Sequence, residues 1–280
     1  MASRARSATA FVTAALVVAA IFIPRLGSAS QAPTGTVTME WFGWSHYRFT
    51  SPTGKVVLTN PWVLNPDSPI QLSDVTQADI ILPADGHGDD MGNALEIAEQ
   101  TGGTIVSPSF EMGTWFLDKG LPRSQLIQAA GPGDRAIIDG ITVRIVNSVH
   151  GSGLGTAASE RVPYGGPAAG FVITFENGWT AYFAGSSAAH QDQALVAQMY
   201  HPDLAILALN GGHEPMDFAM QVKLLMTDNP NLSAVFPHHQ RVEPSAGQTT
   251  IAEAQSAVDA MGLGQTITTP ELGRVYSFSK

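Results

Sequence analysis

The chain has 280 residues, of which 44% are hydrophobic and 14% are charged, and it carries a formal net charge of −10. This composition excludes a disordered chain, and its acidity argues against nucleic acid or anionic lipid as partners. The absence of cysteine excludes disulfides and thiolate zinc sites, so only His, Asp and Glu remain as strong metal ligands.

Residues 1–30 have the layout of a secretory signal peptide. Two arginines precede a 15-residue apolar run over residues 9–23, and small residues at positions 28–30 offer a cleavage site. A retained membrane anchor is the alternative, but a run of this length would cover only about 22 Å of a hydrocarbon core that is roughly 30 Å thick. We therefore expect export to the periplasm or the exterior, with no stable membrane span after processing.

The mature chain is expected to form a single domain over residues 31–280. The first 30 residues hold three of the 14 basic residues and none of the 24 acidic ones, so this domain carries a formal net charge of −13. Its length is sufficient to bury a large core. Nothing in the sequence specifies an oligomer.

Strand patterns dominate the first part of each half of the domain, and strands alternate with helices afterwards. Alternating or short apolar runs predict strands over residues 37–42, 46–50, 55–58, 79–82, 104–106, 136–138, 141–146, 170–175, 180–183, 204–207 and 234–236. Helical periodicity predicts helices over residues 93–100, 193–200, 216–226 and 251–261. This order predicts an α/β (α+β) fold in which two sheets pack together and helices cover both outer faces.

Three further segments complete the expected architecture. Residues 266–268 and 275–278 are candidate edge strands. The stretch over residues 151–170 is rich in Gly, Ser and Pro, and it is expected to form a long loop of the kind that often borders a site.

The segment that follows residues 79–82 concentrates side chains that bind metals. Asp85, His87, Asp89 and Asp90 fall within six residues, after an apolar strand and before a helix. Carboxylates this close repel one another, and a divalent cation relieves that repulsion. Asp85 and Asp90 could also serve as turn and N-cap residues for the following helix, and this alternative stays open.

Two histidines share this placement at the end of a strand. His150 follows the strand over residues 141–146, and His239 follows the strand over residues 234–236. Sites in α/β proteins gather just past the carboxyl ends of strands, so three elements with the same placement favour a metal site over isolated loop residues. The expected metal ligands are Asp85, His87, Asp89, Asp90, His150 and His239.

Three segments carry a resemblance to a known family. Residues 164–173 read Tyr-Gly-Gly-Pro-Ala-Ala-Gly-Phe-Val-Ile, residues 211–217 read Gly-Gly-His-Glu-Pro-Met-Asp, and residues 237–239 read Pro-His-His. In this order, and together with the Asp/His loop, they resemble the metallo-β-lactamase superfamily, in particular the small metal-dependent hydrolases similar to ascorbate-6-phosphate lactonase. The resemblance runs through nearly all of the mature chain and implies a four-layer αβ/βα sandwich.

The resemblance also implies a distribution of the ligands over two metal positions. Asp85, His87 and His150 fall on the first position, and Asp89, Asp90 and His239 fall on the second. The family pattern has His where Asp85 and Asp90 stand in this chain.

Three other positions depart from the family pattern. The carboxylate that bridges the two metals in the family falls on Ser186, and the family's Gly-His-Ser and Ile-Asp-Pro segments read Gly43-Trp44-Ser45 and Thr59-Asn60-Pro61. A serine cannot replace a bridging carboxylate, and two cations without a bridge repel strongly. One divalent metal ion, Zn, Mn or Fe, is therefore expected rather than two.

Two classes of function remain open. The first is an exported hydrolase in which a metal-bound water, oriented or deprotonated by Asp89, attacks a small ester, lactone or phosphodiester substrate. His213 and Ser186 are then expected to contact the substrate. The second is a catalytically inactive protein of the same fold that binds a ligand or partner outside the cytoplasm.

Overall fold

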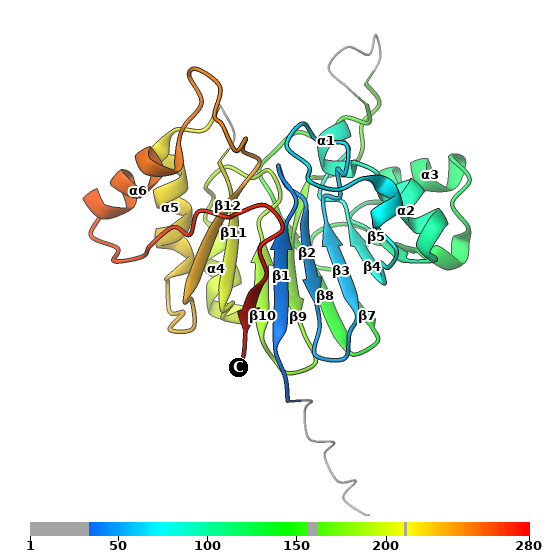
Figure 1. Ribbon diagram of the computed structural model, residues 1–280, viewed down its shortest axis with the longest axis horizontal. Helices are drawn as coiled ribbons and strands as arrows, with labels where there is room; N and C mark the ends of the chain where they lie inside the picture. Colours follow the sequence, from blue (N-terminus) through cyan, green and yellow to red (C-terminus); the bar gives the residue numbers. More distant parts are fainter. Residues whose placement is uncertain (1–33, 156–161, 210–211) are drawn as a thin grey trace, which may run out of the picture. The chain divides into compact units, whose positions relative to one another are not determined.

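Two β-sheets face each other in the computed structural model, which describes residues 34–155, 162–209 and 212–280 (Figure 1). These residues belong to one structural unit, and the expected signal peptide over residues 1–30 lies outside the described residues. Among the residues that the structure describes, no helix combines the length and the apolar character that a membrane span needs.

Each sheet combines antiparallel hairpins with parallel strands. The first sheet has the order β13-β1-β2-β3-β4-β5-β6 and the second has the order β12-β11-β10-β9-β8-β7. The first sheet contains β1 (Val37–Trp41), β2 (Tyr47–Thr50), β3 (Val56–Thr59), β4 (Ile80–Leu82), β5 (Thr104–Ser107), β6 (Leu126–Gln128) and β13 (Tyr276–Phe278). The second contains β7 (Arg135–Ile138), β8 (Ile141–Asn147), β9 (Ala169–Thr174), β10 (Thr180–Phe183), β11 (Leu204–Ala208) and β12 (Ala234–His238).

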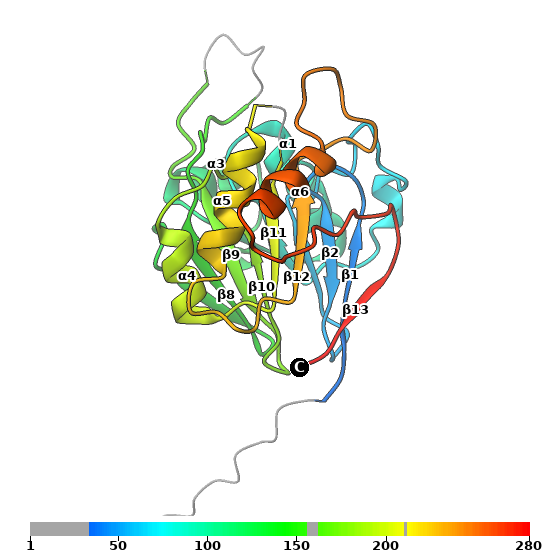
Figure 2. The same cartoon turned by 90° about the vertical axis from the view of Figure 1, so that its left-hand side faces the viewer.

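Helices cover the outer face of both sheets (Figures 1 and 2). They are α1 (Gly88–Met91), α2 (Ala94–Thr101), α3 (Phe110–Asp118), α4 (Asp192–Tyr200), α5 (Pro215–Leu225) and α6 (Ile251–Ala260). Helices α2 and α3 pack on the first sheet, whereas α4, α5 and α6 pack together on the second. Two 3-10 turns, Leu72–Asp74 and Arg123–Gln125, lie in connections.

The main core lies between the sheets. It includes an aromatic cluster in which the rings of Phe49, Phe175 and Trp179 lie 5.7–6.5 Å apart between centroids. Strand β1 alternates between buried and half-buried residues, whereas β11 is buried throughout because helices cover its outer face. The structure thus has the four-layer αβ/βα arrangement, and the predicted fold class is confirmed.

The structure differs from the sequence prediction in four places. Helices α1 and α3 and strand β6 were not expected, and residues 266–268 contribute only an isolated bridge between Ile267 and Val235 instead of a strand. The predicted edge strand over residues 275–278 is present as β13, which pairs antiparallel with β1.

Candidate metal centre

The loop after β4 places carboxylates and an imidazole around the single turn of helix α1. Asp85 Oδ1 accepts a hydrogen bond of 2.8 Å from the backbone N–H of His87, which is the N-cap of α1. Asp85 therefore does stabilise the turn, but with only one of its two carboxylate oxygens. Asp90 lies inside α1 and is not its N-cap, so the capping alternative does not explain this residue.

The segment that follows β8 holds the loop from the other side. His87 and Gly155 form a β-bridge, and the backbone N–H of Gly155 donates to the carbonyl of Gly86 at 3.2 Å. A Cβ at Gly151 would lie 3.3 Å from Cε1 of His87. Glycine at position 151 thus allows the backbone beside His150 to approach the His87 ring closely.

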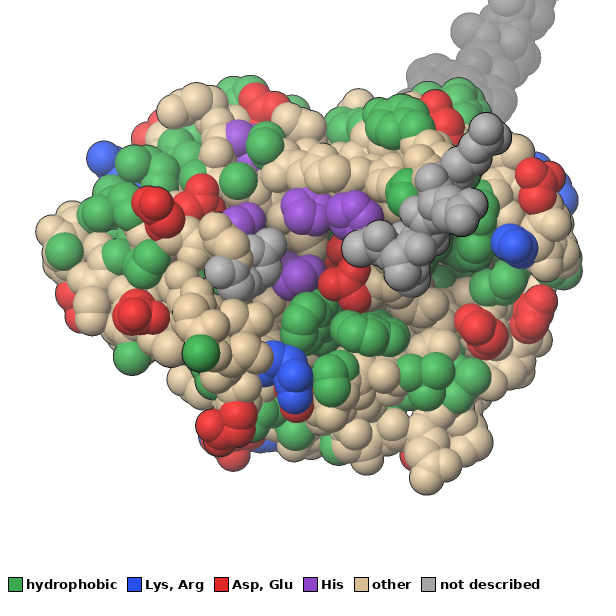
Figure 3. Space-filling view, turned by 90° about the horizontal axis from the view of Figure 1, so that it is seen from above, with side chains coloured by type: hydrophobic (Ala, Val, Ile, Leu, Met, Phe, Trp, Pro, Cys, Tyr) green, Lys and Arg blue, Asp and Glu red, His purple; other side chains and the backbone are tan. Residues whose placement is uncertain are grey.

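Two groups of potential metal ligands form in this way, and Asp90 belongs to both. The first group is Asp85, His87, Asp90 and His150, and the second is Asp89, Asp90 and His239; within each, one ligand atom per residue lies within 4.8 Å of the others. Figure 3 shows the molecule from above relative to Figure 1. Histidine side chains lie beside carboxylates near the middle of the face seen there, and hydrophobic side chains lie next to them. All six residues expected as ligands are therefore brought together.

Two carboxylate oxygens of the site are buried without a protein partner. Asp85 and Asp90 are both fully buried, and Oδ2 of each has no hydrogen-bond partner among the described residues. Burial, reinforced by the charge of Asp89, raises the pKa of Asp85 to about 7. Burial and the charge of Asp85 also raise the pKa of Asp90 well above its usual range. Such oxygens beside imidazoles suit a divalent metal such as Zn, Mn or Fe, so the residues fit the expected cofactor.

Of the two histidines in the first group, His150 is suited to metal binding as a neutral ring. Burial, together with the neighbouring His87, lowers the pKa of His150 to about 4. The two rings meet edge to face, with centroids 5.0 Å apart. A neutral imidazole keeps the lone pair that a metal ligand requires.

The second group is held together by direct contacts. Nε2 of His239 lies 3.1 Å from Oδ2 of Asp89, and Nε1 of Trp44 donates to the same oxygen at 2.9 Å. Burial works against ionisation of Asp89, but these hydrogen bonds outweigh it and lower the pKa of Asp89 to about 2. Burial likewise opposes the charge on His239, but the contact with Asp89 outweighs it and raises the pKa of His239.

An unusual backbone conformation places Trp44 at this contact. Both Trp44 and His239 have positive φ, 51° and 60°, and the backbone N–H of His239 donates to the carbonyl of Trp44 at 3.2 Å. The Trp44 ring lies 4.9 Å from the His239 ring and meets the Trp62 ring edge to face at 5.6 Å. Trp44 is therefore part of the site.

Oδ1 of Asp90 accepts two hydrogen bonds. The Nδ2 amide of Asn60 donates to it, and Oγ of Ser186 donates to it at 2.9 Å. Ser186 is fully buried, which does not support the expected contact with substrate. The contact of Asn60 with Asp90 was not expected; its only sign in the sequence is the Thr-Asn-Pro segment at the end of β3.

Five of the eight histidines lie outside both groups, and two of them, His213 and His238, were considered in the sequence as neighbours of the site. Nδ1 of His213 is 3.8 Å from Oδ2 of Asp217, and the ring is half-buried. His238 is fully buried, with its Nε2 3.0 Å from the carbonyl of Gly185 and its Nδ1 3.0 Å from Oγ of Ser45. His238 is thus held as a structural residue, while its neighbour His239 points its ring at Asp89.

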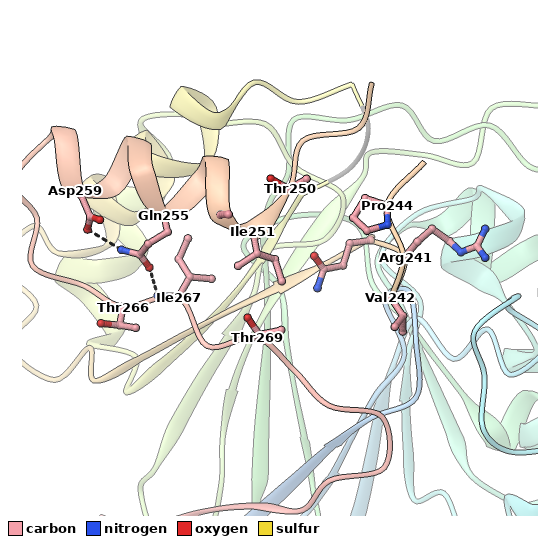
Figure 4. A pocket seen from close by; sticks show the side chains of 12 residues that line it. Arg241, Val242, Pro244, Thr250, Ile251, Gln255, Asp259, Thr266, Ile267 and Thr269 are labelled. Atoms are coloured by element: carbon pink, nitrogen blue, oxygen red, sulfur yellow. Dashed lines mark hydrogen bonds between the residues drawn. The ribbon is translucent and has the colours of Figure 1, made fainter. Parts of the chain in front are cut away.

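A hollow of about 780 Å³ lies between α6, residues 240–244 and residues 266–269 (Figure 4). Several of its polar side chains have partners: Gln255 donates to Asp259 and accepts from the backbone of Ile267, and Arg241 pairs with Asp67. Neither potential ligand group contains a residue of this hollow. This hollow therefore lies apart from the candidate metal centre.

Comparison with known proteins agrees with this geometry. Residues 51–269 match the family described as the beta-lactamase superfamily domain. A metal-dependent hydrolase of Rubrobacter xylanophilus is 33% identical over 180 residues, 64% of this chain and 72% of the relative. One of Cupriavidus metallidurans is 30% identical over 265 residues, 90% of this chain and 88% of the relative.

A solved structure extends the comparison to the fold. Igni18, a metallo hydrolase from the archaeon Ignicoccus hospitalis, superposes with a TM-score of 0.71 at 25% identity and covers 88% of this chain and 100% of its own. The resemblance found in the sequence is confirmed. The chain belongs to the β-lactamase superfamily, as one of its metal-dependent hydrolases.

Proposed function

We propose that this hydrolase cleaves a small ester, lactone or phosphodiester and that its divalent metal binds at the two ligand groups around Asp90. The observation that carries the proposal is the pair of fully buried carboxylate oxygens, Oδ2 of Asp85 and of Asp90, that have no partner among the described residues. Buried polar atoms without a partner are costly, and a cation between them and the imidazoles would compensate that cost.

A bound metal would polarise the scissile carbonyl or phosphoryl group and would lower the pKa of a water molecule to about 7. The protein's own contribution begins with Asp89. Because Trp44 donates to its Oδ2 at 2.9 Å, this carboxylate has a fixed direction from which to orient the attacking water. His213 lies outside both ligand groups and is our candidate for contact with the substrate.

The test is metal content followed by activity. Protein purified without chelator and loaded with Zn, Mn or Fe should hold bound metal by mass spectrometry and should hydrolyse members of a panel of aryl esters, lactones and phosphodiesters. Removal of the metal should abolish turnover, and its return should restore it. Less than ~0.1 equivalent of metal after loading would overturn the proposal. Bound metal without turnover of any substrate would favour a protein that only binds a ligand.

We also propose that the protein is exported and processed before Gln31. The support is the sequence of residues 1–30, with its basic start, apolar run and small residues. Intact mass of the protein from the extracytoplasmic fraction of an expressing cell should correspond to residues 31–280. A full-length mass in the membrane fraction would instead indicate a retained anchor.

A further inference from the structure

The position of Asp90 between the two ligand groups points beyond the presence of a metal. We propose that Asp90 is the carboxylate shared by two metal ions, a role that residue 186 does not fill in this chain. The inference rests on the proposed metal-dependent function of the site. Asp90 is the only residue common to both groups that the described residues form.

The two oxygens of Asp90 have different surroundings. Oδ1 is occupied by hydrogen bonds from Asn60 Nδ2 and from Ser186 Oγ. Oδ2 is buried and has no hydrogen-bond partner in the part of the chain that the structure describes. Hydrogen bonds on one oxygen fix the direction of a carboxylate and leave the other as the ligand atom.

Asn60 is locked as a donor toward Asp90. Its Oδ1 accepts a hydrogen bond of 2.8 Å from the backbone N–H of Ala84, so its Nδ2 is the atom that faces the carboxylate. An aspartate at position 60 would place a second carboxylate against Asp90 and would repel it. The Nδ2 donor of Asn60 therefore matches an acceptor at position 90, which the carboxylate of Asp90 supplies.

Asp90 and the two residues that donate to it all depart from the family pattern that the sequence resembles. Asn60 stands in place of Asp, Asp90 in place of His, and Ser186 in place of the bridging Asp. Because Ser186 donates to Asp90 at 2.9 Å, the carboxylate at position 90 lies one hydrogen bond away from the position that the resemblance assigns to the bridging carboxylate. The three differences are consistent with one coordinated exchange.

This exchange removes the reason to expect a single metal. That expectation rested on two cations that repel without a bridging carboxylate. A shared carboxylate offsets the repulsion between cations held about 3.5–4 Å apart, as in other two-metal sites. Asp90 offers such a carboxylate, with three ligands on one side and two on the other.

The inference can be tested with Mn(II) alone as the probe. The full chain, loaded and then passed through gel filtration, should hold two equivalents by mass spectrometry and should show the EPR spectrum of a coupled pair. The Asp90→Asn variant should hold one equivalent and show the spectrum of isolated ions. Asp192→Asn is the matched control, because Asp192 contacts Asn147 and lies outside both groups; it should retain two equivalents.

A second variant guards against poor folding of Asp90→Asn. The triple variant Asn60→Asp, Asp90→His and Ser186→Asp returns the three positions to the family pattern and should again bind a coupled pair, whereas Ser186→Asp alone should not improve binding. Wild-type protein that saturates at one equivalent, or Asp90→Asn with a coupled pair, would overturn the shared carboxylate. One equivalent with full hydrolysis would leave the proposed function standing, whereas no bound metal would overturn both.

Discussion

The two ligand groups of the metal centre differ in how complete they are without a metal. In the second group, Asp89 already has His239 and Trp44 as hydrogen-bond partners. In the first group, Asp85 keeps one buried oxygen without a partner among the described residues, and His150 is neutral because burial lowers its pKa to about 4. The first group therefore has more to gain from a cation, and we expect it to bind metal more tightly.

This difference between the groups also indicates which of them orients the attacking water and which binds the metal tightly. A carboxylate that is already paired has a fixed direction, which suits a group that orients water. A buried carboxylate oxygen that has no partner among the described residues, beside two imidazoles, suits tight metal binding. Three substitutions test this contrast between the groups, and a fourth tests a buried histidine that lies in neither group.

The largest effect is expected from loss of a ligand of the first group. His87→Asn should remove the tightly bound metal and lower kcat/KM by about 10³-fold or more, beyond the ~10–100-fold that partners outside the ligand set cost. Metal analysis and steady-state kinetics measure both effects. His201→Asn is the matched control, because His201 ends α4 with φ of 43°, a conformation that asparagine tolerates. Wild-type metal content in His87→Asn would remove His87 from the ligands.

A smaller effect is expected in the second group. His239→Asn removes a potential ligand of the second group and should lower kcat/KM by about 100-fold, the upper end of the cost of partners outside the ligand set, while the tight metal of the first group is retained. Titration of the apo-protein with metal should show one weakened site. If His239→Asn lost all metal while His87→Asn kept it, the order of affinities proposed for the two groups would be reversed.

Loss of the Trp44 hydrogen bond should cost less again. Trp44→Phe keeps an aromatic ring beside His239 but removes the donor to Asp89, and a loss of about 10-fold in kcat corresponds to the lower range for a hydrogen bond to a charged group. Metal content should not change. Trp62→Phe is the control, because it leaves the bond between Trp44 and Asp89 in place. Equal losses in the two variants would point to ring packing instead of orientation.

The smallest effect on the site is expected from His46, whose two ring nitrogens also lack partners among the described residues but which lies in neither ligand group. Burial, and then the charge of Arg48, lower its pKa from 6.5 to about 3. The unfolded chain then binds more protons than the folded one as the pH falls from about 6.5 to about 3. The free energy of unfolding should fall over this window by up to ~1.4 kcal/mol per pH unit.

The variant His46→Leu removes the contribution of His46 to the pH dependence of the unfolding free energy. Its unfolding free energy, measured by urea denaturation at several pH values, should fall less steeply on acidification than that of the wild type, while metal content at neutral pH stays the same. The buried His238, whose pKa is also lowered, should continue to contribute. An unchanged slope would mean that His46 is not neutral in the folded protein.

Most of the fold could be predicted from the sequence, because hydrophobic periodicity and chain order suffice for a layered sandwich. Helix α3 could not, because Gly113 in its middle lowers the apparent helix propensity. The structure explains this glycine: a Cβ there would lie 2.6 Å from Cγ of Gln128 on β6. Strand β6 itself is only three residues long, which is too short for a periodic signal.

The residues of the candidate metal centre could also be predicted in part from the sequence. Spacing and strand ends pointed to the six potential ligands that the structure brings together, because those features are local in the sequence. The hydrogen-bond partners of the carboxylates could not be predicted, because they are distant in the sequence. Asn60 and Asp90 are 30 positions apart, and Trp44 and Asp89 are 45 positions apart. Only the folded backbone, with Trp44 at positive φ, creates those contacts.

The buried ring of His238 has a consequence for how such a centre can be inherited. The ring contacts Ser45, which lies between β1 and β2, and Gly185, which follows β10, so it joins the two sheets directly beside the centre. Each ligand group likewise needs a histidine from the second sheet, His150 or His239. A gene fragment that encodes only the Asp/His loop would therefore transfer ligands but no centre, and recombination can pass the centre on only with both sheets.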